Sequence, residues 1–313
     1  MKTLHVTNNY PSKLNPVFGI FVKEQIESLR KQNIECDVFF INGREKGIKE
    51  YLISIFKLRN FLKNNKYDAI HCHHSLSALC LIFTFNFHKN IITSFQNDPI
   101  NEMKIFFNLI KFFSNHLIFK NNSKLIQGTN SHYVPNGVNL NFFKPIDRAL
   151  ACEKLGLDSS KIYILFVSSN FIRKQKRYDI FIKVLKILKE KYSLNDIEKL
   201  VLTNTKRELV PYYFNASSLH LLTSDFEGSP NSVKEALSCN IPVVSKSVGN
   251  VNELLKDVDG SYVSKNNDVN SLVKLVLIVL KNKVRNNGRL MIKKNLLDMN
   301  SISKKIKKIY FNS

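Results

Sequence analysis

Apolar runs of strand length alternate along most of the chain with segments whose apolar residues recur at helical spacing, and turn residues separate the two. Such an alternation is typical of parallel sheets that carry helices on both faces. The apolar runs predict strands at 4–7, 36–41, 91–94, 162–167, 200–202, 219–222, 241–244 and 260–263. The helical spacing predicts helices at 21–29, 46–64, 180–188, 269–280 and around 302–309.

Residues 102–119 carry a wide apolar stripe flanked by Lys104, Lys111 and Lys120. One interpretation is a helix that lies in the interface of a bilayer. A helix that faces the core and leaves its lysines in solvent is at least as good an interpretation. Both interpretations predict helix over this segment.

The segment 218–255 is the strongest candidate for function. Its first strand leads through a polar turn to Pro230, which suits the first turn of a helix with Ser229 as the N-cap. The helix has an apolar face, the next strand follows it, and Gly249 marks another turn. The pattern predicts a strand–loop–helix–strand unit.

Two carboxylates lie in this unit, Glu227 in the loop and Glu235 eight residues on, inside the helix. Backbone N–H groups at a helix N-terminus favour a phosphate, and Gly228 allows the backbone to come close to it. Carboxylates accept hydrogen bonds from neutral hydroxyl groups. The combination suits a nucleotide sugar, and the alternative is a pair of solvated acids.

The same segment resembles the nucleotide-sugar motif of the family 4 retaining glycosyltransferases, of the type found in bacterial polysaccharide biosynthesis, which have the GT-B fold. The motif is a Glu, a Gly, a small or aromatic residue, then Pro or Gly, with a second Glu further on. Residues 227–237 read EGSPNSVKEAL, and Cys239, Pro242 and Val243 follow in the family's places. The resemblance implies that Glu227 binds sugar hydroxyls and that Glu235 binds ribose hydroxyls. It also implies donor-binding roles for Gly19, Gly228, Ser229, Pro230 and Asn231.

Further landmarks extend the resemblance over nearly the whole chain. Residues 16–25 resemble the family's first loop and helix, in which a glycine lies near the donor phosphate or the reacting centre. Residues 67–73 are similar to its third strand, which ends in His-x-His. Packing or lining the cleft is a better interpretation of His71 and His73 than metal ligation, because no acidic or cysteine partner clusters with them. Residues 133–139 resemble the segment that ends the first domain, so we place the boundary near residue 147.

Four cations crowd the expected strand-to-helix junction at 173–177. Cations beside helix N–H groups suit a diphosphate, although a basic loop is often only solvated. In the family an Arg and a Lys at this place hold the donor phosphates and stabilise the leaving group. The resemblance assigns these roles to Arg173 and Lys176, with Glu227 as the third catalytic residue.

The strand at 91–94 is followed by Gln96 and Asn97, where family members often have a His-Gly pair. That histidine lies close to the transferred sugar, so its replacement leaves the acceptor chemistry open. Gln96 and Asp98 are the candidate residues on the acceptor side.

The charge of the chain points to anionic partners. Lys and Arg number 47 against 25 Asp and Glu, which gives a net charge of +22. Such an excess suits a phosphorylated substrate, an anionic membrane surface or nucleic acid. The five scattered cysteines are typical of a reduced, cytoplasmic protein. The sequence shows no signal-peptide pattern and no apolar run of about 18 residues, so we expect a cytoplasmic protein at the inner face of the plasma membrane.

The resemblance implies two Rossmann-like, doubly wound α/β domains facing across a cleft. Residues 1–147 form the acceptor side and 148–313 the donor side, with a last helix at about 300–313 that packs on the first domain. We expect a metal-independent retaining hexosyltransferase, without a cofactor, that uses a nucleotide diphosphate sugar and a saccharide or polyprenyl-linked acceptor. One alternative is a GT-B epimerase. Another is a basic adaptor for membranes or nucleic acid, which is disfavoured because the charge is spread and no nucleic-acid motif is present.

Overall fold

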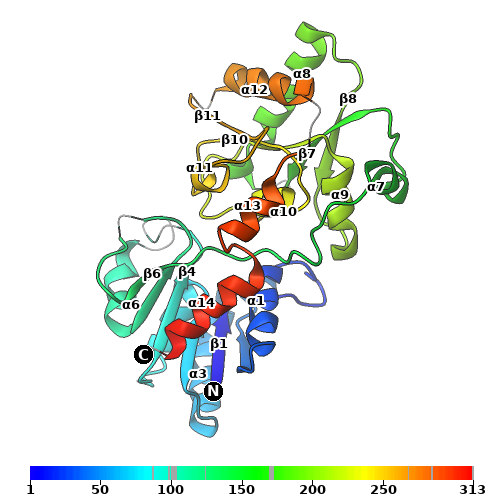
Figure 1. Cartoon of the computed structure of the whole chain (residues 1–313). Helices are drawn as coiled ribbons and strands as arrows, with labels where there is room; N and C mark the ends of the chain where they lie inside the picture. The colour runs from blue at the N-terminus through cyan, green and yellow to red at the C-terminus, as the bar shows by residue number, and fades with distance from the viewer. Residues whose placement is uncertain are drawn as a thin grey trace. The chain divides into compact units, whose positions relative to one another are not determined.

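The chain forms two compact units (Figure 1). The structure is a computed structural model, and it describes all residues except 87, 98, 100–103, 124, 169–172, 267, 283–284 and 312–313. Unit 1 comprises Met1–Gly137 and Met299–Ser313, and unit 2 comprises Val138–Asp298. The division lies before the predicted boundary near residue 147, because Val138 and Phe143 already pack in the core of unit 2.

Unit 1 is built on a parallel sheet of six strands in the order β2-β1-β3-β4-β5-β6. Helices α1 and α14 pack on one face of this sheet, and α3, α4 and α6 pack on the other. The strands are β1 Lys2–Thr7, β2 Glu35–Phe40, β3 Ala69–Cys72, β4 Ile91–Phe95, β5 His116–Phe119 and β6 Ser131–Tyr133. The helices are α1 Ile20–Arg30, α2 Gly43–Lys46, α3 Lys49–Asn64, α4 Ser75–Ile82, η1 Lys104–Phe106, α6 Phe107–Phe113 and α14 Met299–Phe311.

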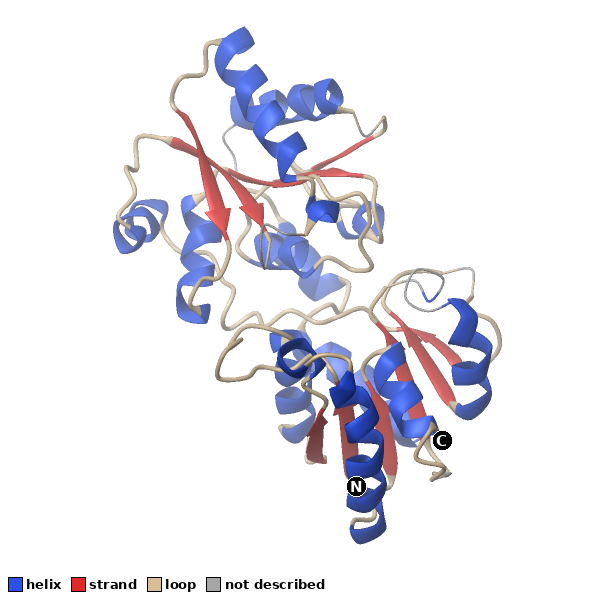
Figure 2. Ribbon diagram, turned by 180° about the vertical axis from the view of Figure 1, so that it is seen from behind, coloured by secondary structure: helices blue, strands red, loops and turns tan. Residues whose placement is uncertain are grey.

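Unit 2 is built on a parallel sheet of five strands in the order β11-β10-β9-β7-β8. Helices cover both faces of each sheet (Figure 2). Helices α8 and α12 pack on the same face of the unit 2 sheet. The strands are β7 Ile162–Val167, β8 Ile197–Leu202, β9 Leu219–Leu222, β10 Val243–Lys246 and β11 Tyr262–Ser264. The helices are α7 Arg148–Leu155, η2 Lys174–Lys176, α8 Tyr178–Tyr192, η3 Arg207–Leu209, α9 Val210–Ala216, α10 Asn231–Ser238, α11 Val251–Leu254, α12 Val269–Asn282 and α13 Gly288–Lys294.

The predicted helix over 102–119 is wrong in its second half. Helix α6 ends at Phe113, and residues 116–119 form β5. Leu117 and Phe119 pack on one face of the sheet and Ile118 packs on the other, as in a strand buried on both sides. Lys120 therefore follows a central strand and is 1% exposed, and it is not a solvated flank of a helix.

The predicted helix over 46–64 corresponds to α3, which begins three residues later, at Lys49, because the chain turns at Gly47 with φ 77° and ψ −172° after the short helix α2. Glycine adopts this conformation without the steric penalty that other residues meet. The sequence pattern also missed β6, which is only three residues long.

Both sheets reverse their strand order next to their first strand. In unit 1 the reversal lies between β1 and β3, and in unit 2 it lies between β7 and β9. Open parallel sheets bind ligands beyond the carboxyl ends of the strands at such a reversal. The loops that follow β7 and β9 are therefore the place in unit 2 where a ligand site is expected.

Candidate active site

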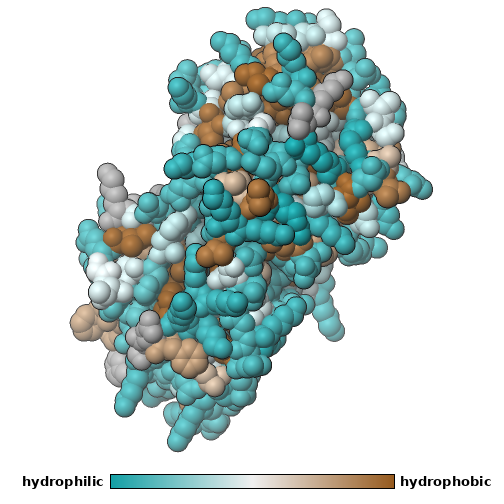
Figure 3. All heavy atoms as spheres, viewed as in Figure 1, coloured by the Kyte–Doolittle hydropathy of each residue, from teal (hydrophilic) through white to brown (hydrophobic). Residues whose placement is uncertain are grey.

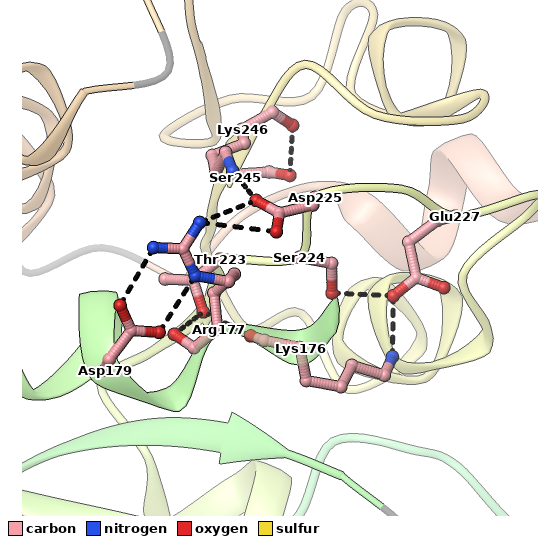
Figure 4. Close-up of polar contacts among 9 residues, drawn as sticks. All are labelled: Lys176, Arg177, Asp179, Thr223, Ser224, Asp225, Glu227, Ser245 and Lys246. Atoms are coloured by element: carbon pink, nitrogen blue, oxygen red, sulfur yellow. Dashed lines mark hydrogen bonds and ion pairs between the residues drawn. The ribbon is translucent and has the colours of Figure 1, made fainter. Parts of the chain in front are cut away.

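The loops after β7 and β9 carry two of the predicted site residues and bring them together. The Nζ of Lys176 lies 2.6 Å from Oε1 of Glu227, and the hydroxyl of Ser224 donates to the same oxygen at 2.7 Å (Figure 4). The two charged side chains are 14% and 13% exposed. In the described part of the chain no hydrogen bond reaches Oε2 of Glu227, so one oxygen is fixed and the other can accept from a ligand.

The turn after β10 supports this loop through a glycine. Gly249 has φ +53°, and a Cβ on it would lie 2.3 Å from the carbonyl oxygen of Gly228. The same oxygen accepts a hydrogen bond from the N–H of Asn250 at 3.1 Å. The loop with Glu227 can lie this close only because residue 249 has no side chain.

Helix α10 begins one residue later than predicted. Pro230 itself occupies the N-cap position, and no side chain caps the helix, so the predicted capping role of Ser229 is wrong. The hydroxyl of Ser229 instead accepts a hydrogen bond from Nζ of Lys234 at 2.9 Å, and Lys234 is completely buried. Asn231 is the first helical residue, and its buried Oδ1 has no hydrogen-bond partner among the described residues.

Glu235 lies on α10 and forms an ion pair that the sequence did not predict. Its Oε1 is 3.6 Å from the guanidinium of Arg207, and the two side chains are 15% and 22% exposed. The same guanidinium lies over the rings of Phe142 and Phe143, at 4.8 and 4.9 Å from their centroids. Stacking of a cation on aromatic faces fixes its position. The only signal in the sequence for Arg207 as the partner of Glu235 is that it is an arginine in the loop after a strand.

Arg173 shares a turn with Lys176 but differs from it in exposure. Its carbonyl accepts a hydrogen bond from the N–H of Lys176 at 2.9 Å, while its side chain is exposed. Within the described ranges, no hydrogen bond or ion pair joins its guanidinium to Glu227. The structure therefore places Lys176, and not Arg173, against the carboxylate.

Arg177 is the centre of an ion-pair cluster beside the Lys176–Glu227 pair (Figure 4). Its guanidinium donates to Asp179 at 2.9 Å through two nitrogens and to Asp225 at 3.1 and 3.3 Å. Lys246, 7% exposed, donates to Asp225 at 2.7 Å. Burial raises the pKa of the Asp225 carboxyl, but the hydrogen bonds and charges of Lys246 and Arg177 outweigh it and hold the pKa below its usual value.

The candidate acceptor residue Gln96 follows β4 in unit 1. Its Nε2 donates to the carbonyl of His73 at 3.1 Å, and its Oε1 accepts from Asn136 at 3.4 Å. Gln96 thus links the segments that follow β3, β4 and β6 at the carboxyl edge of the sheet. Asp98 lies outside the described residues.

Gly19 precedes α1 with φ +67°. A Cβ at this position would lie 2.2 Å from the carbonyl carbon of Asn9 and 2.4 Å from the nitrogen of Tyr10. Only glycine therefore allows the loop after β1 to lie against the start of the helix.

Three buried histidines stack at the centre of the unit 1 sheet. His5, His71 and His73 place ring nitrogens within 4.8 Å of one another, a spacing that could hold a metal ion. However, His71 bonds Tyr310 at 2.6 Å and Ser94 at 2.7 Å, and His5 bonds His73 at 2.9 Å. These bonds occupy both nitrogens of His71, so the rings form a packed network. Burial lowers the pKa of His5 to about 3.

Residues 192–296 match the family model described as Glycosyl transferases group 1, and this stretch contains Glu227 and Glu235. The chain is 23% identical to an Escherichia coli protein, UDP-Gal:alpha-D-GlcNAc-diphosphoundecaprenol alpha-1,3-galactosyltransferase, over 75% of this chain and 71% of that one. It is 26% identical to an uncharacterised Klebsiella pneumoniae protein of the cps region, over 69% of this chain and 70% of that one.

Solved structures match the whole chain. The sucrose-phosphate synthase of Thermosynechococcus elongatus matches with a TM-score of 0.77 at 15% identity, covering 99% of this chain and 98% of that one. The Anabaena protein HepE in complex with UDP and glucose matches with a TM-score of 0.72 at 15% identity, covering 100% of both chains. These matches confirm the predicted two-domain Rossmann-like fold. The family match, the relatives and the fold agree, and the protein is a glycosyltransferase of the GT-B fold.

Proposed function

We propose that the protein is a retaining hexosyltransferase that takes a sugar from a UDP-linked donor bound to unit 2 and transfers it to a lipid-linked saccharide. The Lys176–Glu227 pair at the strand-order reversal carries this proposal. The E. coli relative is named for UDP-Gal and for an acceptor linked to diphosphoundecaprenol, and HepE was solved with UDP and glucose. Nothing in these comparisons supports an epimerase.

Lys176 neutralises the donor diphosphate and stabilises it as it leaves, because a fixed cation favours the charge that develops there. Arg173, exposed on the same turn, adds a second positive charge. Oε2 of Glu227 accepts from hydroxyls of the sugar, since Oε1 is already bound by Lys176 and Ser224. The N–H groups at the start of α10 and the free Oδ1 of Asn231 are further polar groups for the donor.

Glu235 binds the ribose hydroxyls in this proposal. Arg207 holds one oxygen of the carboxylate in place, and its own position is fixed by Phe142 and Phe143. A carboxylate that is oriented in advance loses less conformational entropy when it binds. Attack by the acceptor on the face from which the diphosphate leaves would give retention without a covalent enzyme intermediate.

The acceptor binds on unit 1, which also docks on the anionic inner face of the plasma membrane. Ile48, the N-cap residue of α3, is 83% exposed, and Leu52 and Phe56 within the helix are 64% and 71% exposed. Their spacing of four residues places them on one side of the helix. Exposed cations of the same helix, such as Lys57 and Lys63, can approach anionic lipid head groups. No described helix is long and apolar enough to cross a bilayer.

A thermal-shift panel of UDP-, GDP- and ADP-sugars tests the donor assignment. A ligand that binds only the native state raises the melting temperature, and we expect the UDP-sugars to do so. Glu235→Ala should abolish the shift, while Glu190→Ala, which removes an exposed glutamate of α8, should keep it. Equal shifts in wild type and Glu235→Ala would contradict the ribose assignment, and the absence of any shift would contradict the donor site itself.

The alternatives make different predictions in two further measurements. An epimerase would release free sugar from the nucleotide sugar without needing an acceptor. A basic adaptor would bind heparin or DNA in a salt-sensitive manner and show no affinity for nucleotide sugars.

A further inference from the structure

Asp225 connects three parts of unit 2 beside the Lys176–Glu227 pair. Its carboxylate binds Arg177 of the turn after β7 and Lys246 at the end of β10, and Asp225 itself follows β9. Its N–H donates to the carbonyl of Gln175 at 2.9 Å. One residue thus joins the ends of β7, β9 and β10 through both its side chain and its backbone.

The turn that carries Lys176 needs such support. Arg177, the next residue, has φ 51° and ψ 54°, in the left-handed region. This conformation is unfavourable for a residue with a Cβ, and it persists only where the surroundings hold it. The hydroxyl of Thr223 holds the turn from the other side, since it donates to the carbonyls of Lys176 and Arg177 at 2.8 and 3.1 Å.

We propose that Asp225 is a positioning residue, which acts on the donor through Lys176 by holding the turn at 174–177 so that the ammonium group faces the diphosphate. The inference rests on the proposed function, because it assumes that Lys176 binds that diphosphate. In this arrangement Lys246 neutralises Asp225, and Arg177 links it to the backbone next to Lys176.

Charge alone predicts the opposite effect, and this difference makes the inference testable. Asp225 is an anion close to the place where an anionic ligand binds. If it acted only through its charge, its removal would strengthen the binding of a nucleoside diphosphate. If it positions Lys176, its removal weakens binding.

The experiment is a double-mutant cycle, with isothermal titration calorimetry of the full chain against UDP, GDP and ADP. The nucleotide that the wild type binds most tightly is carried through the cycle. Asp225→Asn should weaken its binding about tenfold, as expected when a hydrogen bond to a charged group is lost. In the Lys176→Met background, Asp225→Asn should change the affinity by less than about twofold, because the group through which it acts is gone.

Two other variants keep the result interpretable. Thr223→Val removes the hydroxyl that holds the same turn with little change in shape, so it should also weaken binding and should also lose its effect in the Lys176→Met background. Asp196→Asn removes a carboxylate from an exposed ion pair with Lys161 and should leave the affinity unchanged. The calorimetric stoichiometry reports the folded fraction of each variant.

Suppose that Lys176→Met binds the nucleotide more weakly than the wild type does, while Asp225→Asn and Thr223→Val bind it as tightly or more tightly. This result would overturn the positioning inference and leave the donor assignment intact. The same loss for Asp225→Asn in both backgrounds would also overturn it, since the residue would not act through Lys176. Unchanged binding by Lys176→Met, or no binding of any of the three nucleotides by the wild type, would overturn the donor assignment and the inference with it.

Discussion

Lys120 lies directly after β5 with its ammonium group enclosed by protein. The Nζ has no hydrogen-bond partner in the described part of the chain. Burial, and to a smaller extent the charge of Lys120, lowers the pKa of His71 and His73. Burial lowers the pKa of Lys120 to about 7. The side chain is therefore close to half-protonated near neutral pH, unlike a solvated lysine.

The lowered pKa gives the stability of the protein a specific dependence on pH. Between pH 7 and about 10 the unfolded chain carries a proton on Lys120 that the folded chain has released, so the free energy of unfolding rises with pH over this window. Lys120→Met should remove this contribution, and the difference between wild type and variant should grow toward pH 7. Urea unfolding followed by circular dichroism at pH 7, 8 and 9 measures that difference.

Lys111→Met, at an exposed position on α6, provides the control and should follow the wild type at each pH. A constant difference between Lys120→Met and wild type over the three pH values would mean that Lys120 keeps its proton in the folded state.

Helix α14 completes one face of the sheet of unit 1, although it comes from the far end of the chain. Ile302 and Ile306 are fully buried there with α1, and the hydroxyl of Tyr310 bonds His71. Its apolar residues belong to the same core cluster as Ala69 of β3, Ile92 of β4 and Ile118 of β5, so the core of unit 1 depends on this helix.

Ile306→Ala should therefore lower the free energy of unfolding by about 2–5 kcal/mol, the usual cost of truncating a buried Ile. Lys308→Ala, on the exposed side of the same helix, should change it by less than about 0.5 kcal/mol. Chemical denaturation followed by circular dichroism suits the chain, which has no tryptophan. A similar small change in both variants would show that α14 adds little to the core.

How much of an element is predictable depends on how local its determinants are. The unit from β9 to β10 was predicted with its two glutamates, because its strand length, proline and glycine act within a few residues. The helix over 102–119 was wrong from residue 114 onward. There the pairing of His116–Phe119 with two neighbouring strands decides the structure, and an apolar stripe alone does not reveal it.

The difference between local signals and contacts of distant segments also decides which residues of the site were predictable. The sequence predicted Lys176 and Glu227, and the fold places them in contact. The contacts of Arg207 with Glu235 and of Asp225 with Lys246 join segments that meet only after the sheet has formed. No spacing along the chain indicates such partners, so they could not be predicted.

On the scale of the whole molecule, the net charge is +22. Figure 3 shows one face of the molecule, on which hydrophilic side chains predominate and hydrophobic ones are scattered. A charge of this size favours anionic surfaces at low salt. In the proposed docking, the apolar side of α3 would add a contact that salt does not screen.

Vesicles that contain phosphatidylglycerol should therefore bind the protein, less strongly as the salt concentration rises. The double substitution Leu52→Ser and Phe56→Ser should reduce sedimentation with these vesicles about tenfold or more, because it removes most of the exposed apolar area of α3. Leu290→Ser, at an exposed position in unit 2, should bind as the wild type does. Equal binding by all three proteins would contradict docking through α3.

The return of the chain from unit 2 to unit 1 at Met299 has a consequence for biosynthesis. While the ribosome is still translating, every residue of unit 2 emerges before the helix that unit 1 needs. Unit 2 can therefore acquire its native structure on the nascent chain, whereas unit 1, although its first 137 residues are made earlier, must wait until the segment from Met299 onward has been translated. During that interval the apolar surface of unit 1 that later packs against Ile302 and Ile306 is exposed to solvent. Exposed apolar surface promotes aggregation, so we expect residues 1–137 to need a chaperone more than unit 2 does.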